Sequence, residues 1–396
     1  MGRWALGRTL AAMALVATAA TARAQTDAPD SERYTLRAEL GAEYDTNAHR
    51  AEVVAGAVNP PVIASPVERV VVSGTLSDLV ADGQAIALAA TVAGKLYDAN
   101  GTHDEDVAVV SSSAAWQTTV NDKSALTLSA AYYEAFQGAP DNLEDASLRR
   151  NFRSLVPSLQ LDWSAAERVT LAASAGYRMF VFKPDRDIDF DAPNVSLELR
   201  WARQPDSGAE WEGAAGAAFE RRTFGGPAFI GCPAPAQPGT DIPCSGPETR
   251  VDDFLMSHLE VTRTGRVLLG LGYAFQLNLS NSFGETVMRH FAIGRAALAL
   301  PGGLMLAARA ELLFAFYRDP VPVGVGQIAP GNTFVSVESI EDENRSSARV
   351  DLSRELGERM RLVARYTFYV NELGVTAPVS YHRQTLLLSL ALALEK

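Results

Sequence analysis

The sequence lacks a long apolar run after residue 24. The longest candidate, Ala296–Phe316, is interrupted by Pro301-Gly302-Gly303 and carries Arg309 and Glu311. A membrane-spanning helix needs about 20 consecutive, predominantly apolar residues. Even so, 47% of the residues are hydrophobic and only 21% are charged. We therefore expect either a soluble protein or one that crosses a membrane as a β-barrel, because only helices and closed barrels satisfy the backbone inside lipid.

An excess of basic residues is also missing. The chain has 35 lysines and arginines against 47 aspartates and glutamates, which gives a formal net charge of −12. Proteins that bind nucleic acid carry a basic footprint for the phosphate backbone. The sequence thus predicts no nucleic-acid partner.

Patterns for catalysis are absent as well. None of the five histidines belongs to a recognisable nucleophile or zinc pattern; they are His49, His103, His258, His290 and His382. Phosphate-binding glycine loops and dinucleotide fingerprints do not occur. Ser257 and His258 would point to opposite faces of a strand, so they are not expected to act together. We expect no enzyme and no bound cofactor, apart from divalent cations at acidic loops.

The N-terminus has the features of a secretory signal peptide. Arg3 and Arg8 precede the small and apolar stretch Thr9–Ala20, and Ala22-Arg23-Ala24 supplies a small-x-small cleavage site. Residues 1–24 are therefore predicted to be removed, which leaves residues 25–396 as one domain. The alternative is an N-terminal membrane anchor, although the apolar run is shorter than the about 20 residues that a span needs.

Only two cysteines are present, Cys232 and Cys244, and both lie in one proline-rich segment. In a secreted chain, two cysteines close in sequence favour a disulfide. Two free thiols are the alternative, and a metal site would need further ligands.

Apolar and polar side chains alternate along the chain with a period of two. In Arg33–Tyr44, the positions of Tyr34, Leu36, Ala38, Leu40, Ala42 and Tyr44 form an apolar set, and the intervening positions are mostly charged. This pattern predicts a strand with one apolar and one polar face. Tyr34 and Tyr44, one at each end of the apolar face, have the spacing of rings at two water–lipid interfaces.

The same pattern recurs along the chain and predicts about 16 strands, within roughly 14–18. The further strands are expected at Val70–Leu79, Gln84–Tyr97, Val107–Thr118, Ser124–Tyr133, Ser154–Trp163, Arg168–Arg178, Asn194–Arg203, Trp211–Phe219, Phe254–Thr262, Val267–Leu279, Met288–Leu300, Leu304–Tyr317, Ser346–Ser353, Met360–Val370 and Tyr381–Leu394. Their connections alternate between short turns and long loops, as in an outer-membrane barrel. The prediction is an all-β, antiparallel, up-and-down transmembrane barrel; a soluble sandwich or solenoid is the alternative.

The charged alternate positions are expected to face a wet lumen, because charges of both signs facing lipid would be costly. The predicted pore-lining residues are Arg33, Arg37, Glu39, Glu43, Lys95, Arg178, Glu198, Arg200, Arg309, Glu311, Arg349, Asp351, Arg361, Arg365 and Arg383. Barrel closure would make the first and last strands neighbours, and Arg33, Arg37, Glu39 and Glu43 would then meet Arg383 and Tyr381. These groups either contact solutes or pair with one another to stabilise the wall.

An acidic segment lies next to one predicted strand. Asp185, Asp187, Asp189 and Asp191 occupy every second position. Carboxylate clusters of this kind bind Ca²⁺ weakly or bridge through divalent cations to lipopolysaccharide. A solvated acidic loop is the alternative reading.

Residues 41–50, Gly-Ala-Glu-Tyr-Asp-Thr-Asn-Ala-His-Arg, resemble the first strand and first loop of a proteobacterial family of outer-membrane β-barrels. Members of that family often begin with a Tyr-Asp-Ser/Thr-Asn phrase. The resemblance implies a porin-like barrel, and some members are proposed to export exopolysaccharide with a periplasmic export protein. Such barrels commonly end in an aromatic residue, whereas this sequence ends in Leu392-Ala393-Leu394-Glu395-Lys396.

Together these features predict an aqueous conduit in the outer membrane of a Gram-negative bacterium. Polysaccharide export follows from the resemblance, whereas passage of hydrophilic solutes needs only the barrel. The expected partners are outer-membrane lipid, lipopolysaccharide, the barrel assembly machinery and a periplasmic polysaccharide export protein. The alternative is a non-conducting surface protein that binds partners through its loops.

Overall fold

The structure, a computed structural model, describes most of the chain. The described residues are 33–51, 53–54, 61–137, 151–183, 186–203, 209–233, 241–318, 346–370, 379–380 and 382–395. The predicted signal peptide and its cleavage site lie outside them. No helix in these ranges is long and apolar enough to cross a membrane.

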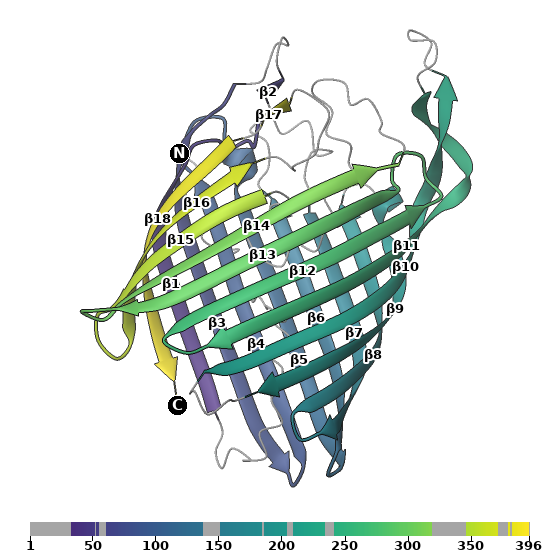
Figure 1. The fold of residues 1–396 in the computed structure, drawn as a ribbon. Coiled ribbons are helices and arrows are strands. Elements are labelled where there is room, and N and C mark those ends of the chain that lie inside the picture. Colours follow the sequence, from purple (N-terminus) through teal and green to yellow (C-terminus); the bar gives the residue numbers. More distant parts are fainter. Residues whose placement is uncertain are drawn as a thin grey trace.

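Sixteen strands form one closed antiparallel barrel, as the sequence predicted (Figure 1). Each strand pairs with its neighbours in chain order, and β1 closes the barrel on β18. The strands are β1 (Arg33–Asp45), β3 (Ser65–Ala81), β4 (Gln84–Tyr97), β5 (Val107–Asn121), β6 (Ser124–Gln137), β7 (Asn151–Ala166), β8 (Val169–Lys183), β9 (Phe190–Arg203), β10 (Glu210–Pro233), β11 (Asp241–Thr264), β12 (Val267–Ser280), β13 (Val287–Leu300), β14 (Leu304–Tyr317), β15 (Ser346–Glu355), β16 (Met360–Val370) and β18 (His382–Glu395).

Small elements accompany the barrel. β2 (Val53–Val54) and β17 (Val379–Ser380) pair as a separate two-stranded sheet. Two 3₁₀ turns, η2 (His103–Glu105) and η4 (Arg186–Ile188), lie in connections between strands. Segments near the two ends of the sequence therefore pair with each other outside the barrel wall.

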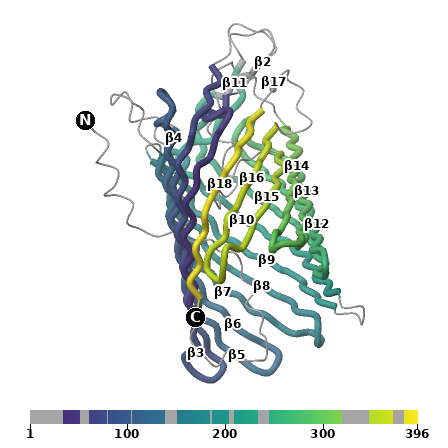
Figure 2. Tube along the Cα trace, turned by 90° about the vertical axis from the view of Figure 1, so that its left-hand side faces the viewer, coloured from purple at the N-terminus to yellow at the C-terminus, as the bar shows by residue number. Residues whose placement is uncertain are grey.

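The register at the closing seam brings the two ends of the barrel sequence together. Leu36 pairs with Leu394, and Asp45 pairs with Thr385. Figure 2 shows β1 and β18 side by side along the whole wall. Because β1 also pairs with β3, its backbone groups are used on both edges and the sheet has no free edge.

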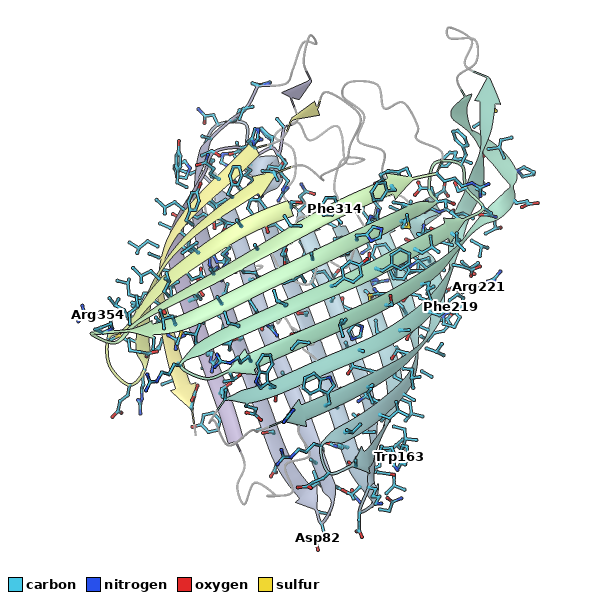
Figure 3. The ribbon with its side chains drawn as sticks, in the orientation of Figure 1. Asp82, Trp163, Phe219, Arg221, Phe314 and Arg354 are labelled. Carbon is cyan, nitrogen blue, oxygen red and sulfur yellow. A yellow bond between two sulfur atoms is a disulfide. The ribbon has the colours of Figure 1, made fainter. Side chains whose placement is uncertain are left out.

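The outer face is apolar, and aromatic residues lie near both ends of it. Leu388 on β18 and Leu271 on β12 are 56% and 71% exposed, respectively. Figure 3 shows Trp163 and Phe219 projecting from the outside of the barrel. Exposed outward rings lie toward the short-turn end at Tyr34, Trp116, Trp163 and Trp211, and toward the long-loop end at Tyr44, Phe136, Phe219 and Phe316. Two aromatic belts around an apolar band are typical of a barrel that spans a bilayer.

The connections also separate by end. The turn between β3 and β4 is only Asp82–Gly83, and Gly83 has a φ of +70°. Such two-residue hairpin turns require positive φ values, which glycine adopts without steric cost. Asp82 lies at the bottom tip of the barrel in Figure 3, away from the long connections. We assign the short-turn end to the periplasm and the long-loop end to the outside.

One sequence prediction was wrong. The expected strands Trp211–Phe219 and Phe254–Thr262 leave a long loop between them, which would include Phe224–Arg250, but β10 and β11 are each 24 residues long and occupy most of that segment. They form a twisted hairpin that projects beyond the rim (Figure 1). The pairing shifts on both sides of Pro227, and it resumes with Phe229 opposite Ser245 and Ile230 opposite Cys244. Proline and glycine obscured the alternation because they interrupt a regular ladder without ending the pairing.

The predicted disulfide is confirmed and lies in this projecting hairpin. Cys232 and Cys244 are bonded, with Cα atoms 5.9 Å apart. Nearby, the Ser282 hydroxyl accepts the Phe229 N–H at 2.9 Å. Phe283 N donates to Phe229 O at 2.8 Å. The β12–β13 connection therefore supports the base of the hairpin.

The outward face generates a test of the membrane assignment. Leu388→Arg places a charge at mid-strand on the lipid side, and we expect it to lower the free energy of unfolding in lipid vesicles by about 2–4 kcal/mol. Ala307→Arg is the matched control, because Ala307 lies on the inner face opposite Asp351. Urea titration followed by tryptophan fluorescence measures both. Equal effects of the two substitutions would contradict the assignment of faces.

Candidate functional site: the lumen wall

The inner face of the barrel carries acidic and basic side chains that pair across neighbouring strands. Lys95 on β4 donates to Glu43 on β1 at 2.9 Å, and both side chains are buried. Arg69 on β3 lies 3.9 Å from the same Glu43 and 3.7 Å from Glu39. β3 lies between β1 and β4 in the sheet, so Arg69 meets residues of an adjacent strand and the Lys95–Glu43 pair spans β3.

A second group of buried polar residues closes the seam, and we call it the seam cluster. Arg383 on β18 donates to both carboxylate oxygens of Asp45, at 3.0 Å from Nε and 2.6 Å from Nη2. The Tyr97 hydroxyl lies 3.4 Å from Arg383 Nη2. Asp45 also accepts the Asn47 N–H at 2.9 Å, and Asn47 bonds both backbone groups of Ala51. The cluster fixes the first loop to the last strand.

The seam cluster corrects one prediction about Arg383. Closure does make β1 and β18 neighbours, but Arg383 meets Asp45 instead of Arg37, Glu39 or Glu43. The reason is the antiparallel register, which places Asp45 opposite Thr385 at the long-loop end. Arg37 pairs instead with Glu395, at 3.0 Å and near the short-turn end. The Arg33 side chain and Tyr381 lie outside the described residues.

The other predicted lumen residues also have charged partners on the inner face. Their pairs are Arg178 with Glu220 at 3.1 Å, Arg200 with Asp162 at 3.2 Å and with Glu198, Glu198 with His258 at 3.1 Å, Arg309 with Glu311, Arg349 and Arg365 with Asp351 at 2.7 Å each, and Arg361 with Glu355 at 2.6 Å. Exposure separates them, because Arg361 and Glu355 are 50% and 55% exposed whereas Arg365 is 12% exposed. The geometry thus favours the wall-stabilising role for these charges.

The acidic segment does not gather into a metal site in the part of the chain that the structure describes. Asp185 lies outside that part, and no group of three or more potential ligands occurs within it. The Asp189 carboxylate accepts the Phe182 N–H at 2.6 Å. A Cβ at Gly226 would lie 2.7 Å from the Asp187 carbonyl oxygen, so glycine permits the η4 turn to approach β10.

A cavity of about 310 Å³ opens on the inner face between β8 and β13, toward the long-loop end. Arg178, Arg222, Arg250 and Arg289 come from four different strands and line it. We call it the arginine cavity. Glu220, Asp252 and Glu285 also line it, so its walls hold four guanidinium groups and three carboxylates.

Aromatic rings support the arginines of this cavity. The Arg222 guanidinium carbon lies 5.1 Å from the Phe190 ring centre and 4.6 Å from that of Phe254. Arg250 lies 4.2 Å over the Phe224 ring. Rings that pack on a guanidinium hold its plane in one orientation and favour its charge. The rings themselves continue a stack around the wall, with Phe180 and Phe190 centres 4.8 Å apart.

Ion pairs fix most of the charges in the cavity. Arg222 donates to Glu220 at 2.6 Å, and Arg250 lies 2.7 Å from Asp252 and 3.1 Å from Glu285. Glu285 follows β12 in the connection to β13. Burial raises the pKa of its carboxyl group, and the neighbouring Arg250 opposes that rise.

Most of this cavity is not predicted by the sequence pattern. Arg222 and Arg250 lie between the expected strands Trp211–Phe219 and Phe254–Thr262, where the pattern predicts no strand. Arg289 was in a predicted strand, and its parity with Arg295 would have assigned it to the inner face. Arg69 was missed because the strand was expected to start at Val70, whereas β3 starts at Ser65.

Comparisons with known proteins were made by sequence and by structure. Neither family models nor the sequences of curated proteins match this chain. CdiB from Acinetobacter baumannii has a similar structure, with a TM-score of 0.50 and 10% identity over 91% of this chain and 60% of CdiB. The chain has the fold of an outer-membrane β-barrel. The closed barrel and its apolar belt place it in the outer membrane of a Gram-negative cell.

Two further solved structures cover nearly the whole barrel. OccAB1 from Acinetobacter baumannii has a TM-score of 0.48 and 8% identity, over 92% of this chain and 97% of OccAB1. An anion-selective porin from Comamonas acidovorans has a TM-score of 0.45 and 10% identity, over 92% and 99% of the two chains. At these identities the likeness concerns the fold alone.

The seam cluster generates a prediction about stability. Asp45→Asn keeps the shape of the side chain but leaves the Arg383 side chain, 3% exposed, without its counter-charge. We expect the free energy of unfolding to fall by about 3–5 kcal/mol, as for other broken buried pairs. Urea denaturation of the detergent-folded barrel measures this change.

The control for Asp45→Asn is Glu355→Gln. It breaks the exposed pair with Arg361 and is expected to cost less than about 1 kcal/mol. A loss of similar size in both variants would refute a special role for the seam cluster.

Proposed function

We propose that this barrel is a passive aqueous conduit for small hydrophilic solutes across the outer membrane. The observation that carries the proposal is the inner face, where ion pairs such as Arg200 with Asp162 and Arg349 with Asp351 occur around the wall. Charged groups are retained on a wall that water reaches, whereas a lipid-facing charge costs several kcal/mol.

The number of strands supports the same proposal. Barrels of about eight strands are filled by their own side chains, and barrels of about 16–18 strands leave an aqueous lumen. This barrel has sixteen strands. The arginine cavity also opens on the inner face, where a solute in transit would meet it.

Polysaccharide export is a finer form of this proposal. Its support is the resemblance of residues 41–50 to barrels proposed to export exopolysaccharide. In this chain Asp45 and Asn47 of that segment are buried in the seam cluster, where they hold the first loop. A periplasmic export protein would then be the partner, and genes for glycosyltransferases near the gene for this barrel would support it.

Single-channel recording tests the conduit. We expect the purified, refolded protein to give discrete conductance steps in a planar bilayer, and liposomes that contain it to swell in isosmotic solutions of small neutral sugars. Heat-denatured protein in the same detergent is the control. If the folded barrel gives no steps above the detergent background, the conduit is refuted and a non-conducting surface protein is favoured.

A further inference from the structure

The arginine cavity contains one arginine that differs from the other three. Arg178, Arg222 and Arg250 each have a carboxylate within 3.1 Å. Arg289 has no ion pair with any residue in the described ranges, and it is only 7% exposed. Its Nε also has no hydrogen-bond partner there. An arginine this buried ordinarily has an anionic partner, because desolvating a charge is costly.

Amide side chains of the cavity have unsatisfied groups as well. The Asn194 Nδ2 donor and the Gln276 Oε1 acceptor have no partner among the described residues, and the same is true of the Asn278 Oδ1 acceptor. The orientation of the Asn278 amide is fixed, because its Nδ2 donates to Asp252 at 3.1 Å and to the Glu285 carbonyl at 2.9 Å. Buried polar groups in native proteins rarely lack partners, so several around one cavity call for an explanation.

All four of these residues line the same cavity. Gln276 on β12 is the direct cross-strand neighbour of Arg289 on β13. Asn194 lines the same cavity from β9, and Asn278 lies two residues beyond Gln276 on the same face of β12. The cavity volume of about 310 Å³ is at the lower end of the about 300–1,000 Å³ range for small-molecule sites.

The pattern of unused donors and acceptors defines a ligand. Arg289 and Asn194 require an acceptor, for which a carboxylate matches the planar guanidinium. Gln276 and Asn278 require donors, which hydroxyl groups supply and a fully ionised phosphate does not. We propose that the arginine cavity binds a single hydroxylated carboxylic acid of sugar size, a hexuronate, with its carboxylate on Arg289 and its hydroxyl groups on the amides.

The four arginines against three carboxylates give this wall a local net positive charge in a chain of net charge −12. The three ion-paired arginines already have partners, so Arg289 supplies the unbalanced charge. The proposal deepens the conduit function and rests on it, because a hexuronate reaches the cavity through the lumen.

Calorimetric titration of the full-length, detergent-folded protein with glucuronate tests the site without requiring conduction. We expect glucuronate to bind about tenfold or more tightly than glucose, which lacks the carboxylate, and than acetate, which lacks the hydroxyl groups. Arg289→Gln should weaken glucuronate binding about tenfold and leave the weak binding of glucose unchanged. Equal affinity for glucuronate and glucose in the unmodified protein would overturn the proposal.

Arg295→Gln is the matched control, because Arg295 lies six residues further along β13 on the same face and pairs with Glu260 outside the cavity. It should bind glucuronate like the unmodified protein. Resistance to SDS before heating shows whether each variant is folded. If Arg289→Gln does not fold, Asn194→Ala provides the second test, with about fivefold weaker glucuronate binding expected. Unchanged affinity in a folded Arg289 or Asn194 variant would also overturn the proposal.

Planar-bilayer recording keeps this proposal separate from the conduit function. Glucuronate at concentrations that saturate the calorimetric site should reduce chloride current through the unmodified channel, and the Arg289→Gln channel should require about tenfold more. Conductance steps without glucuronate binding would refute the site and leave the conduit intact. Glucuronate binding without conductance steps would refute the conduit and leave the site intact.

Discussion

The structure depends on the closure of β1 against β18. Inside lipid no water is available for unpaired backbone groups, and each such group would cost several kcal/mol. A sheet with two edges is therefore not viable there, whereas a closed sheet satisfies every strand. The seam uses eleven paired positions from Thr35–Glu395 to Asp45–Thr385. Below the rim, Gly41 faces Leu387 and Ser389 so closely that a Cβ would lie 2.8 Å from either side chain.

Charge at the seam complements this backbone closure. Hydrogen bonds of the ladder are the same at every register, so the ladder alone does not choose one register over a slipped one. The buried Asp45–Arg383 pair forms only when β1 and β18 are aligned as observed. Asn47 extends the same constraint to the first loop by bonding Ala51. We interpret the Asp-Thr-Asn phrase as a register and loop anchor.

The inner wall combines two kinds of charge that differ in their consequences. Paired groups such as Glu43 with Lys95 satisfy each other, and they are consistent with a role in holding the wall. In contrast, the Arg289 Nε and single atoms of the Asn194, Gln276 and Asn278 amides are buried without a hydrogen-bond partner in the described part of the protein. Unsatisfied polarity in a native structure marks a functional site more often than a stability device. Whether a charged residue is paired or lacks a partner cannot be recognised from that residue alone.

The sequence by itself determined the barrel, its strand number to within about two, and the sense of its faces. A period of two fixes which side chains share a face, and lipid requires the apolar set to be outside. Tyr34 and Leu40 could thus be assigned to the exterior, and Cys232 could be paired with Cys244. The faces of the strands depend on the local alternation of side chains, which is visible in the sequence, and on the requirement that apolar side chains face lipid.

Only the tertiary structure decided which lumen charges meet. Arg383 and Asp45 are 338 residues apart, and their contact follows from closure and register, which alternation does not specify. Arg178, Arg222, Arg250 and Arg289 converge because four curved strands present them to one cavity. The extension of β10 and β11 also depends on tertiary structure. Pairing between the two strands continues past Pro227, although the local sequence has a low propensity for strand. Sequence patterns report the face of a residue, whereas its partner depends on contacts across the fold.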